Sequence, residues 1–263
     1  MLPRRTLLAL ALTLGAAPAF AADPVPLAAH RALYTLTLAS ARGEDVAAAR
    51  GTMSYEVEDS CDGWATQQRL SMTITNRSGQ DIEMVTDYAT WERKDGLRMR
   101  FHMRQTTEQA VTEQVDGDAT LEGPGGAGTV RYTVPEPKEV PLPPGTLFPT
   151  AHTAAIIAAA EAGQKFLNIP IFDGTGDKGA QQSSVLILNW NPPGEAPYPP
   201  LAAFPSGRVR IAFFDRAKTD QTPDYEVGMR YWANGVANDL SMDFGDFVMK
   251  GELSEFELIK PHC

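Results

Sequence analysis

The chain has 263 residues, of which 33 are acidic and 23 are basic, so its formal net charge at neutral pH is −10. An acidic balance argues against nucleic acid and anionic lipid surfaces as partners. A chain of this length is compatible with one large β domain, because β folds of about 200–250 residues often form a single domain.

The first 21 residues have the three parts of a secretory signal peptide. Arg4 and Arg5 give a positive start, an apolar run follows at 7–14, and Ala19-Phe20-Ala21 has the pattern of a cleavage site. We therefore expect a signal peptide at 1–21, export to the periplasm by the general secretory route rather than the twin-arginine route, and a single domain at 22–263. No later stretch has the ~20 apolar residues of a membrane helix, so we expect no membrane-spanning segment.

Alternation of apolar and polar residues recurs along the chain, which predicts strands with one buried face. In the clearest case the apolar positions are Leu97, Met99, Phe101 and Met103, and the polar positions between and after them are Arg98, Arg100, His102 and Arg104. Segments 30–38, 53–57 and 70–74 repeat the pattern. Asp95-Gly96, Asp116-Gly117 and the glycine cluster 123–128 are typical of turns between strands. We therefore predict sequential hairpins in an antiparallel meander.

A proline-rich stretch and one alanine-rich helix follow. Residues 135–149 contain six prolines, which predicts an extended loop. We predict a helix over 150–162, with Thr150 as its N-cap and Gly163 as its C-terminal stop. Residues 154–160 carry no polar side chain on any face, so most sides of the helix should be buried. Small alanines allow a sheet to approach closely, and we expect the sheet to wrap this helix.

Strands are predicted again in the last third, at 166–172, 185–190, 209–214, 225–231 and 236–244. Asn234-Gly235 is a hairpin signal between the last two of these. Residues 185–188 are apolar on both faces, which predicts a strand covered on both sides. Phe247 and Met249 have the opposite parity to Phe256, and a β-bulge near Gly251 would reconcile them.

Two motifs suggest ligands but fit turns better. Residues 123–128 match G-x-G-x-x-G, yet a strand pattern follows them in place of the helix that a dinucleotide site needs. Residues 173–179 suggest a calcium loop, but a third ligand is missing and Ser184 stands where the bidentate Glu belongs. We interpret both segments as turns.

No motif for catalysis or metal binding is present. The four histidines are isolated from one another, two cysteines are too few for a Cys-rich zinc site, and there is no G-x-S-x-G elbow. A Ser, His and Asp arrangement in three dimensions stays open, with His152 more typical of packing than of catalysis. Tyr55, Trp64 and Trp91 either line a ligand groove or pack in the core. We therefore expect no enzyme activity, no cofactor and no metal.

The two cysteines, Cys61 and Cys263, are predicted to form one disulfide. An exported chain enters an oxidising compartment, and an even pair of cysteines without metal-ligand neighbours is best explained by pairing.

Several stretches together resemble the cell-envelope-integrity protein EipB family of Gram-negative periplasms. The matching segments are His30-Arg31-Ala32-Leu33-Tyr34-Thr35-Leu36, Gly51, Tyr55-Glu56, Cys61-Asp62-Gly63-Trp64, Trp91-Glu92, Leu147-Phe148-Pro149-Thr150-Ala151-His152-Thr153, Phe172-Asp173-Gly174, Asp243-Phe244-Gly245-Asp246-Phe247, Gly251, Leu253 and Cys263. The resemblance implies a mainly β fold, an antiparallel β-spiral or incomplete curled barrel around a helix. It also implies a role in envelope integrity under stress without an assigned enzymatic activity.

Three functions compete at this stage. The leading hypothesis is a non-enzymatic periplasmic protein that supports the envelope by binding a protein partner. The alternative is a carrier of a lipid, acyl chain or lipoprotein in the groove of the curled sheet, and an envelope hydrolase is third.

Overall fold

The computed structural model describes residues 25–43, 45–218, 222–260 and 263. The signal peptide predicted at 1–21 lies outside the described residues. No helix within the described part is both long enough and apolar enough to cross a membrane.

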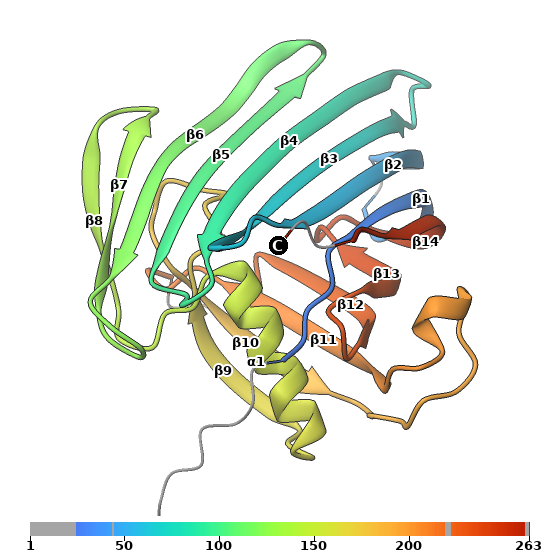
Figure 1. Ribbon diagram of the computed structural model, residues 1–263. Helices are drawn as coiled ribbons and strands as arrows, with labels where there is room; N and C mark the ends of the chain where they lie inside the picture. Colours follow the sequence, from blue (N-terminus) through green and yellow to red (C-terminus); the bar gives the residue numbers. More distant parts are fainter. Residues whose placement is uncertain (1–24, 44, 219–221, 261–262) are drawn as a thin grey trace, which may run out of the picture.

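The strands of the described residues join one antiparallel sheet of 14 strands, in the order β8-β7-β6-β5-β4-β3-β2-β1-β14-β13-β12-β11-β10-β9. The sheet curls so that β1 to β8 form one wall and β9 to β13 the other, with β14 between β1 and β13, while its edge strands β8 and β9 are not paired with each other (Figure 1). The predicted incomplete curled barrel is therefore confirmed. The strands are β1 (His30–Ala41), β2 (Val46–Asp59), β3 (Gly63–Asn76), β4 (Asp81–Arg93), β5 (Arg98–Thr107), β6 (Ala110–Leu121), β7 (Gly128–Val134), β8 (Lys138–Leu142), β9 (Phe166–Ile171), β10 (Gln181–Ile187), β11 (Ser206–Phe214), β12 (Tyr225–Trp232), β13 (Ala237–Asp243) and β14 (Phe247–Leu258).

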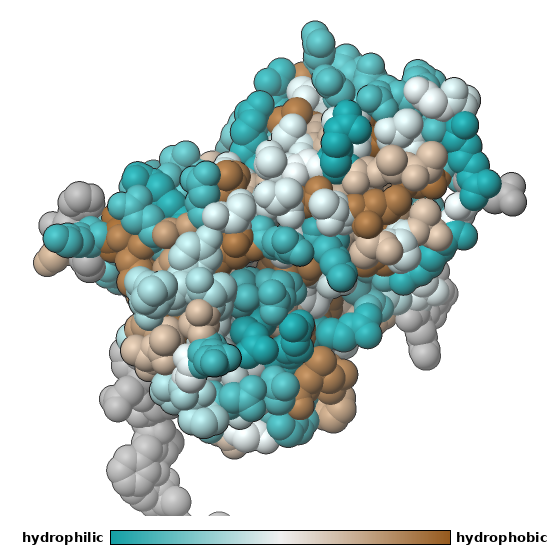
Figure 2. All heavy atoms as spheres, turned by 90° about the vertical axis from the view of Figure 1, so that its right-hand side faces the viewer, coloured by the Kyte–Doolittle hydropathy of each residue, from teal (hydrophilic) through white to brown (hydrophobic). Residues whose placement is uncertain are grey.

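Alternation decides which face of each strand points inward. On β5, Met99, Phe101 and Met103 are buried, whereas Arg100 and His102 between them are exposed. The same parity puts Tyr34 and Leu36 of β1 inside. Successive side chains of a strand point to opposite faces, so the apolar set of each strand reaches the interior together. Figure 2 shows the outside of the side that bears the η1 turn (Pro199–Leu201), where hydrophilic residues predominate and hydrophobic ones form smaller patches.

The helix α1 (Pro149–Glu161) lies between the two walls at one end of the curl (Figure 1). Ile156 and Ile157 are fully buried, and Ile156 packs in a cluster with residues of β1, β2 and β10 to β14. No residue from 154 to 160 is exposed, as predicted. Gly163 has a φ of +74°, and the N–H of Gln164 reaches back to the carbonyl of Ala159, which ends the helix at the predicted place.

The predicted N-cap of this helix is wrong. Phe148, not Thr150, occupies the N-cap position and gives no side-chain cap. Pro149 follows at the first helical position, where a fixed φ near −65° suits the helix and the missing N–H costs nothing. Thr150 therefore lies inside the helix, and its N–H and hydroxyl both bond to the carboxylate of Glu92 on β4.

Two further expectations in the first half are wrong. The proline-rich segment is not entirely loop, because β8 forms within it; Pro141 is tolerated there since β8 pairs only with β7. Asp116-Gly117 lies inside β6 rather than in a turn. A Cβ at Gly117 would lie 2.2 Å from the carbonyl oxygen of Arg131, so this glycine permits close strand approach.

The second half differs from prediction at two points. Leu188 is 51% exposed and Leu186 is half-buried, so the outer face of β10 is not covered. The β-bulge lies at Ser254 rather than near Gly251, because Leu33 pairs with Glu255 and the next residue of β1 pairs with Leu253. Gly251 is regularly paired, and a Cβ there would meet side chains of both neighbouring strands at 3.0 Å.

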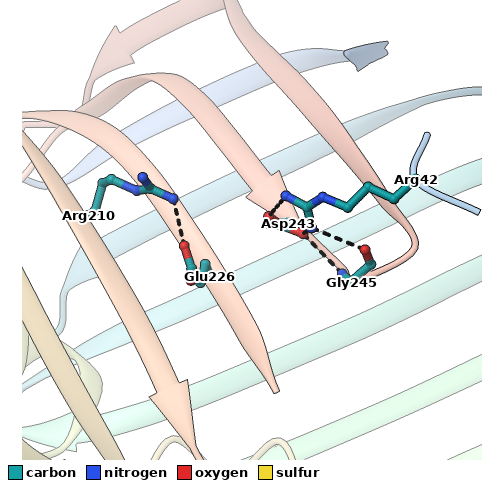
Figure 3. Close-up of polar contacts among 5 residues, drawn as sticks. All are labelled: Arg42, Arg210, Glu226, Asp243 and Gly245. Atoms are coloured by element: carbon teal, nitrogen blue, oxygen red, sulfur yellow. Dashed lines mark hydrogen bonds and ion pairs between the residues drawn. The ribbon is translucent and has the colours of Figure 1, made fainter. Parts of the chain in front are cut away.

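The motif Asp243-Phe244-Gly245-Asp246-Phe247 forms the turn between β13 and β14 (Figure 3). Arg42, just after β1, donates to both carboxylate oxygens of Asp243 at 2.6 Å and to the carbonyl of Gly245 at 3.1 Å. The N–H of Gly245 donates to Asp243 in turn. Next to it, Arg210 on β11 bonds Glu226 on β12. The Arg42–Asp243 pair thus ties the turn to the end of β1, and because both arginines are exposed, the two ion pairs add little to the stability of the fold.

Cys61 and Cys263 are joined as a disulfide, with their Cα atoms 5.6 Å apart. Cys61 lies in the turn between β2 and β3, so the bond ties the end of the chain to an early hairpin.

We predict that Ile156→Asp destabilises the protein by several kcal/mol, because it places a carboxyl without a partner in the core and removes apolar contacts. Ala162→Asp, at the exposed C-cap of the same helix, is the control and should cost well under half as much. Urea denaturation measures both. Equal midpoints for Ile156→Asp and the wild type would contradict the buried-helix arrangement.

A second prediction concerns the disulfide. It closes a loop of about 200 residues, for which the loop-entropy relation gives an upper value of about 5 kcal/mol, and residual structure in the unfolded chain should reduce this to ~2–4 kcal/mol. Reduction should lower the melting temperature while the β-sheet circular dichroism persists at low temperature. Titration of the denatured, unreduced protein should find no free thiol, and two thiols per chain would refute the bond.

Candidate functional site

The concave face of the curled sheet borders a partly open cavity of about 460 Å³. Inward side chains of β1 to β6 line one side, those of β11 to β13 line the other, and the first turn of α1 lies at one end. The volume lies within the roughly 300–1,000 Å³ of small-molecule sites. This cavity is the candidate functional site.

The two walls of the cavity differ in chemistry. The wall from β11 to β13 is mostly apolar, and its lining includes Ile211, Val227, Met229, Leu240 and Met242. The wall from β3 to β5 presents uncharged polar side chains, including Thr66, Gln68, Thr86, Thr90 and Gln105. Methionine side chains adapt to ligands of varied shape, which suits a site for flexible chains. The cavity is therefore amphipathic and deformable.

Buried tyrosines connect elements across the cavity. The hydroxyl of Tyr34 donates to the carbonyl of Ala237 at 2.7 Å, and that of Tyr88 donates to the carbonyl of Asp173 in the loop between β9 and β10. Burial raises the pKa of Tyr34 and of Tyr88 above the ordinary phenol value. Both phenols therefore stay neutral and act as hydrogen-bonding links between the walls.

His152 and Ser183 form a buried pair at the base of the cavity. The Nε2 atom of His152 lies 2.8 Å from the Ser183 hydroxyl, which itself donates to the carbonyl of Ile169. Because the hydroxyl proton is used, Nε2 carries the hydrogen and donates to the serine. Burial lowers the pKa of His152 to about 4. Ser183 has no exposed surface, so the pair is a structural contact rather than a nucleophile with its base.

A buried carboxylate, Glu92 of β4, holds the start of α1. It is 1% exposed, and it accepts bonds from the Thr150 N–H at 2.8 Å and the Thr150 hydroxyl at 2.8 Å. Burial raises the pKa of Glu92 to about 7, although these bonds at the positive end of the helix oppose the shift. Glu92 thus provides the cap that the side chain at position 148 cannot.

Of the three aromatic residues singled out in the sequence, Tyr55 and Trp64 line the cavity and Trp91 does not. The indole N–H of Trp91 bonds the Ser60 hydroxyl, and the Arg100 guanidinium lies 5.5 Å from a ring of Trp91. Trp91 therefore belongs to the outer face of the sheet.

The histidines are not gathered into one site. His30 and His152 line the cavity, His102 faces outward and contacts Asp116, and His262 lies outside the described residues. Within those residues, no group of three or more His, Cys, Asp or Glu side chains could hold a metal. Asp173 and Asp177 serve the turn between β9 and β10, where Asp173 accepts from Thr175 and Asp177 pairs with Lys138 at 2.6 Å.

Sequence reasoning missed Glu92 and the polar wall. Both lie at inward positions of strands, where alternation predicts apolar residues, so only the apolar half of the lining could be anticipated from the pattern.

The raised pKa of Glu92 predicts a pH-dependent stability. In the unfolded chain the carboxyl has its ordinary pKa of about 4.5, so ionising it above pH 7 costs more in the folded state. The contribution of Glu92 to the free energy of unfolding should therefore increase as the pH falls from about 7 to 4.5, by up to roughly 3 kcal/mol.

Urea denaturation at pH 5 and pH 8 tests this, with Glu92→Gln as the variant. The stability difference between wild type and variant should shift in favour of wild type at pH 5. Glu83→Gln, on an exposed residue of the same strand, is the matched control. A difference that is the same at both pH values would contradict the assigned protonation.

Comparisons with known proteins agree with the geometry. The EipB-like family matches residues 21–260. The chain is 32% identical to the cell envelope integrity protein EipB of Brucella abortus (strain 2308) over 254 residues, which cover 92% of this chain and 88% of the relative. A crystal structure of a β-barrel-like protein of a domain of unknown function, also from Brucella abortus, superposes with a TM-score of 0.81 and 29% identity over 90% of this chain and all of the other. The chain therefore belongs to the EipB-like family.

Proposed function

We propose that this protein supports the integrity of the cell envelope from the periplasm by holding an acyl or similar apolar chain in its interior cavity. The observation that carries this proposal is the cavity of about 460 Å³ between the two walls of the sheet. A barrel that is filled only by its own side chains would leave no such volume.

The relationship to a cell envelope integrity protein supports the cellular role. The absence of a long apolar helix in the described residues fits a protein that acts from the aqueous side of the membrane. The relative's name refers to no reaction, and the buried His152–Ser183 pair offers no accessible nucleophile, so binding is favoured over catalysis.

The protein partner that led the sequence-based hypotheses stays a prediction. The feature that favours it is the edge strand β9, where Phe166 is 72% exposed beside the exposed Leu188. The cavity is the stronger argument because it is an interior volume built from many strands, whereas the edge is one short strand.

Binding of the neutral fluorescent probe N-phenyl-1-naphthylamine tests the cavity. The wild type should bind it saturably with increased emission, because the apolar wall excludes water from the probe. Val227→Trp fills the cavity from β12 and should weaken binding at least tenfold. Ser241→Trp, on the exposed face of β13, should leave binding unchanged. Equal binding by both variants would place the probe elsewhere and refute the proposal.

Native mass spectrometry of protein purified from its own envelope provides a second measurement. A bound lipid mass supports the carrier, and a co-purified protein with an empty cavity supports the partner hypothesis.

A further inference from the structure

We propose that the cavity selects uncharged amphiphiles and rejects anionic ones, so that its ligand is an ester- or amide-linked chain without a negative group inside the protein. This inference rests on the proposed function and specifies the ligand class of the same cavity. It follows from which charged side chains line the cavity and which lie on the outer face of the sheet.

No lysine or arginine lines the cavity among the residues that the structure describes. The basic residues closest in sequence to the lining lie on the other face of the sheet. Arg104 is exposed beside the lining residue Met103, and Arg69 pairs with Asp87 outside. A phosphate, sulfonate or carboxylate inside the cavity would therefore meet no cation.

The imidazoles do not supply the missing charge. His30 is buried, and its Nδ1 lies 2.8 Å from the carbonyl of Ala28, while His152 donates to Ser183. Burial lowers the pKa of both rings, so both are neutral at the pH of the periplasm. The carboxyl groups that do line the cavity, Glu113 and Asp173, would repel an anion.

The uncharged polar wall of the cavity can bind the neutral polar group of a ligand. Thr66, Gln68, Thr86, Thr90 and Gln105 offer hydroxyl and amide groups from three adjacent strands. Such groups can hydrogen-bond an ester, amide or hydroxyl of a ligand whose chain lies on the apolar wall opposite. An anion taken out of water without a paired cation loses its solvation, and these neutral groups recover only part of that loss.

Two probes with the same aromatic frame test the selectivity. N-phenyl-1-naphthylamine is neutral, and 8-anilinonaphthalene-1-sulfonate adds one sulfonate. The wild type should bind the neutral probe at least tenfold more tightly, and the Val227→Trp variant should weaken binding of the neutral probe.

A matched pair of variants assigns the effect to the cavity. Gln68→Lys adds a cation on the inner face of β3, and Gln67→Lys adds the same charge to the adjacent residue on the outer face. The inner variant should raise the affinity for the sulfonate probe at least tenfold, and the outer variant should change it less than twofold. If Gln68→Lys fails to fold by circular dichroism, Gln105→Lys on β5 makes the same test.

The outcomes separate the two proposals. Equal affinities of the wild type for both probes, or equal effects of the inner and outer lysines, would overturn the charge selectivity and leave the carrier function standing. No binding of the neutral probe by the wild type would overturn the carrier function and the selectivity with it.

Discussion

The contact between α1 and the concave face of the sheet is the interaction on which the rest of the structure depends. A sheet of 14 strands with two unpaired edges has no ring of hydrogen bonds to set its curvature. Ile156, Ala159 and Ala160 pack into the cluster formed by β1, β2 and β10 to β14. Because the cluster draws on strands from both sides of the curl, burial of this helix is what holds the two walls at their separation.

The start of the helix is held by contacts with two other elements of the fold. Glu92 of β4 binds its first turn, and just before the helix the N–H of Leu147 donates to Pro170 of the edge strand β9 while its carbonyl accepts from Phe172, which follows β9. The start of the helix therefore connects β4 in one wall to the edge strand β9 of the other wall. A buried carboxyl is a costly way to make this connection, but an aliphatic residue there would leave the first N–H groups of the helix without acceptors.

The cavity exists because one helix fills only part of the curl. Apolar side chains pack around the middle and the last turn of α1. The cavity lies next to the first turn of the helix, where the interior is not filled. The side chains that line the cavity then define what can enter: among the described residues no lysine or arginine lines it, whereas hydroxyl, amide and phenol groups and the carboxyl groups of Glu113 and Asp173 do. The same alternation that builds the sheet thus keeps the lysines and arginines of the described strands out of the cavity lining.

The sequence by itself determined the strand-rich class, the inward parity of residues such as Met99 and Phe101, the alanine-rich helix and its end at Gly163. These follow from local periodicity and from backbone chemistry, which a short segment contains in full. Only the tertiary structure decided that Pro141 lies in an edge strand, that Asp116-Gly117 lies within β6, and that Glu92 rather than Thr150 caps the helix. It alone also revealed the cavity and its polar wall. Each of these depends on contacts between residues far apart in the chain, and local periodicity carries no information about which distant groups meet.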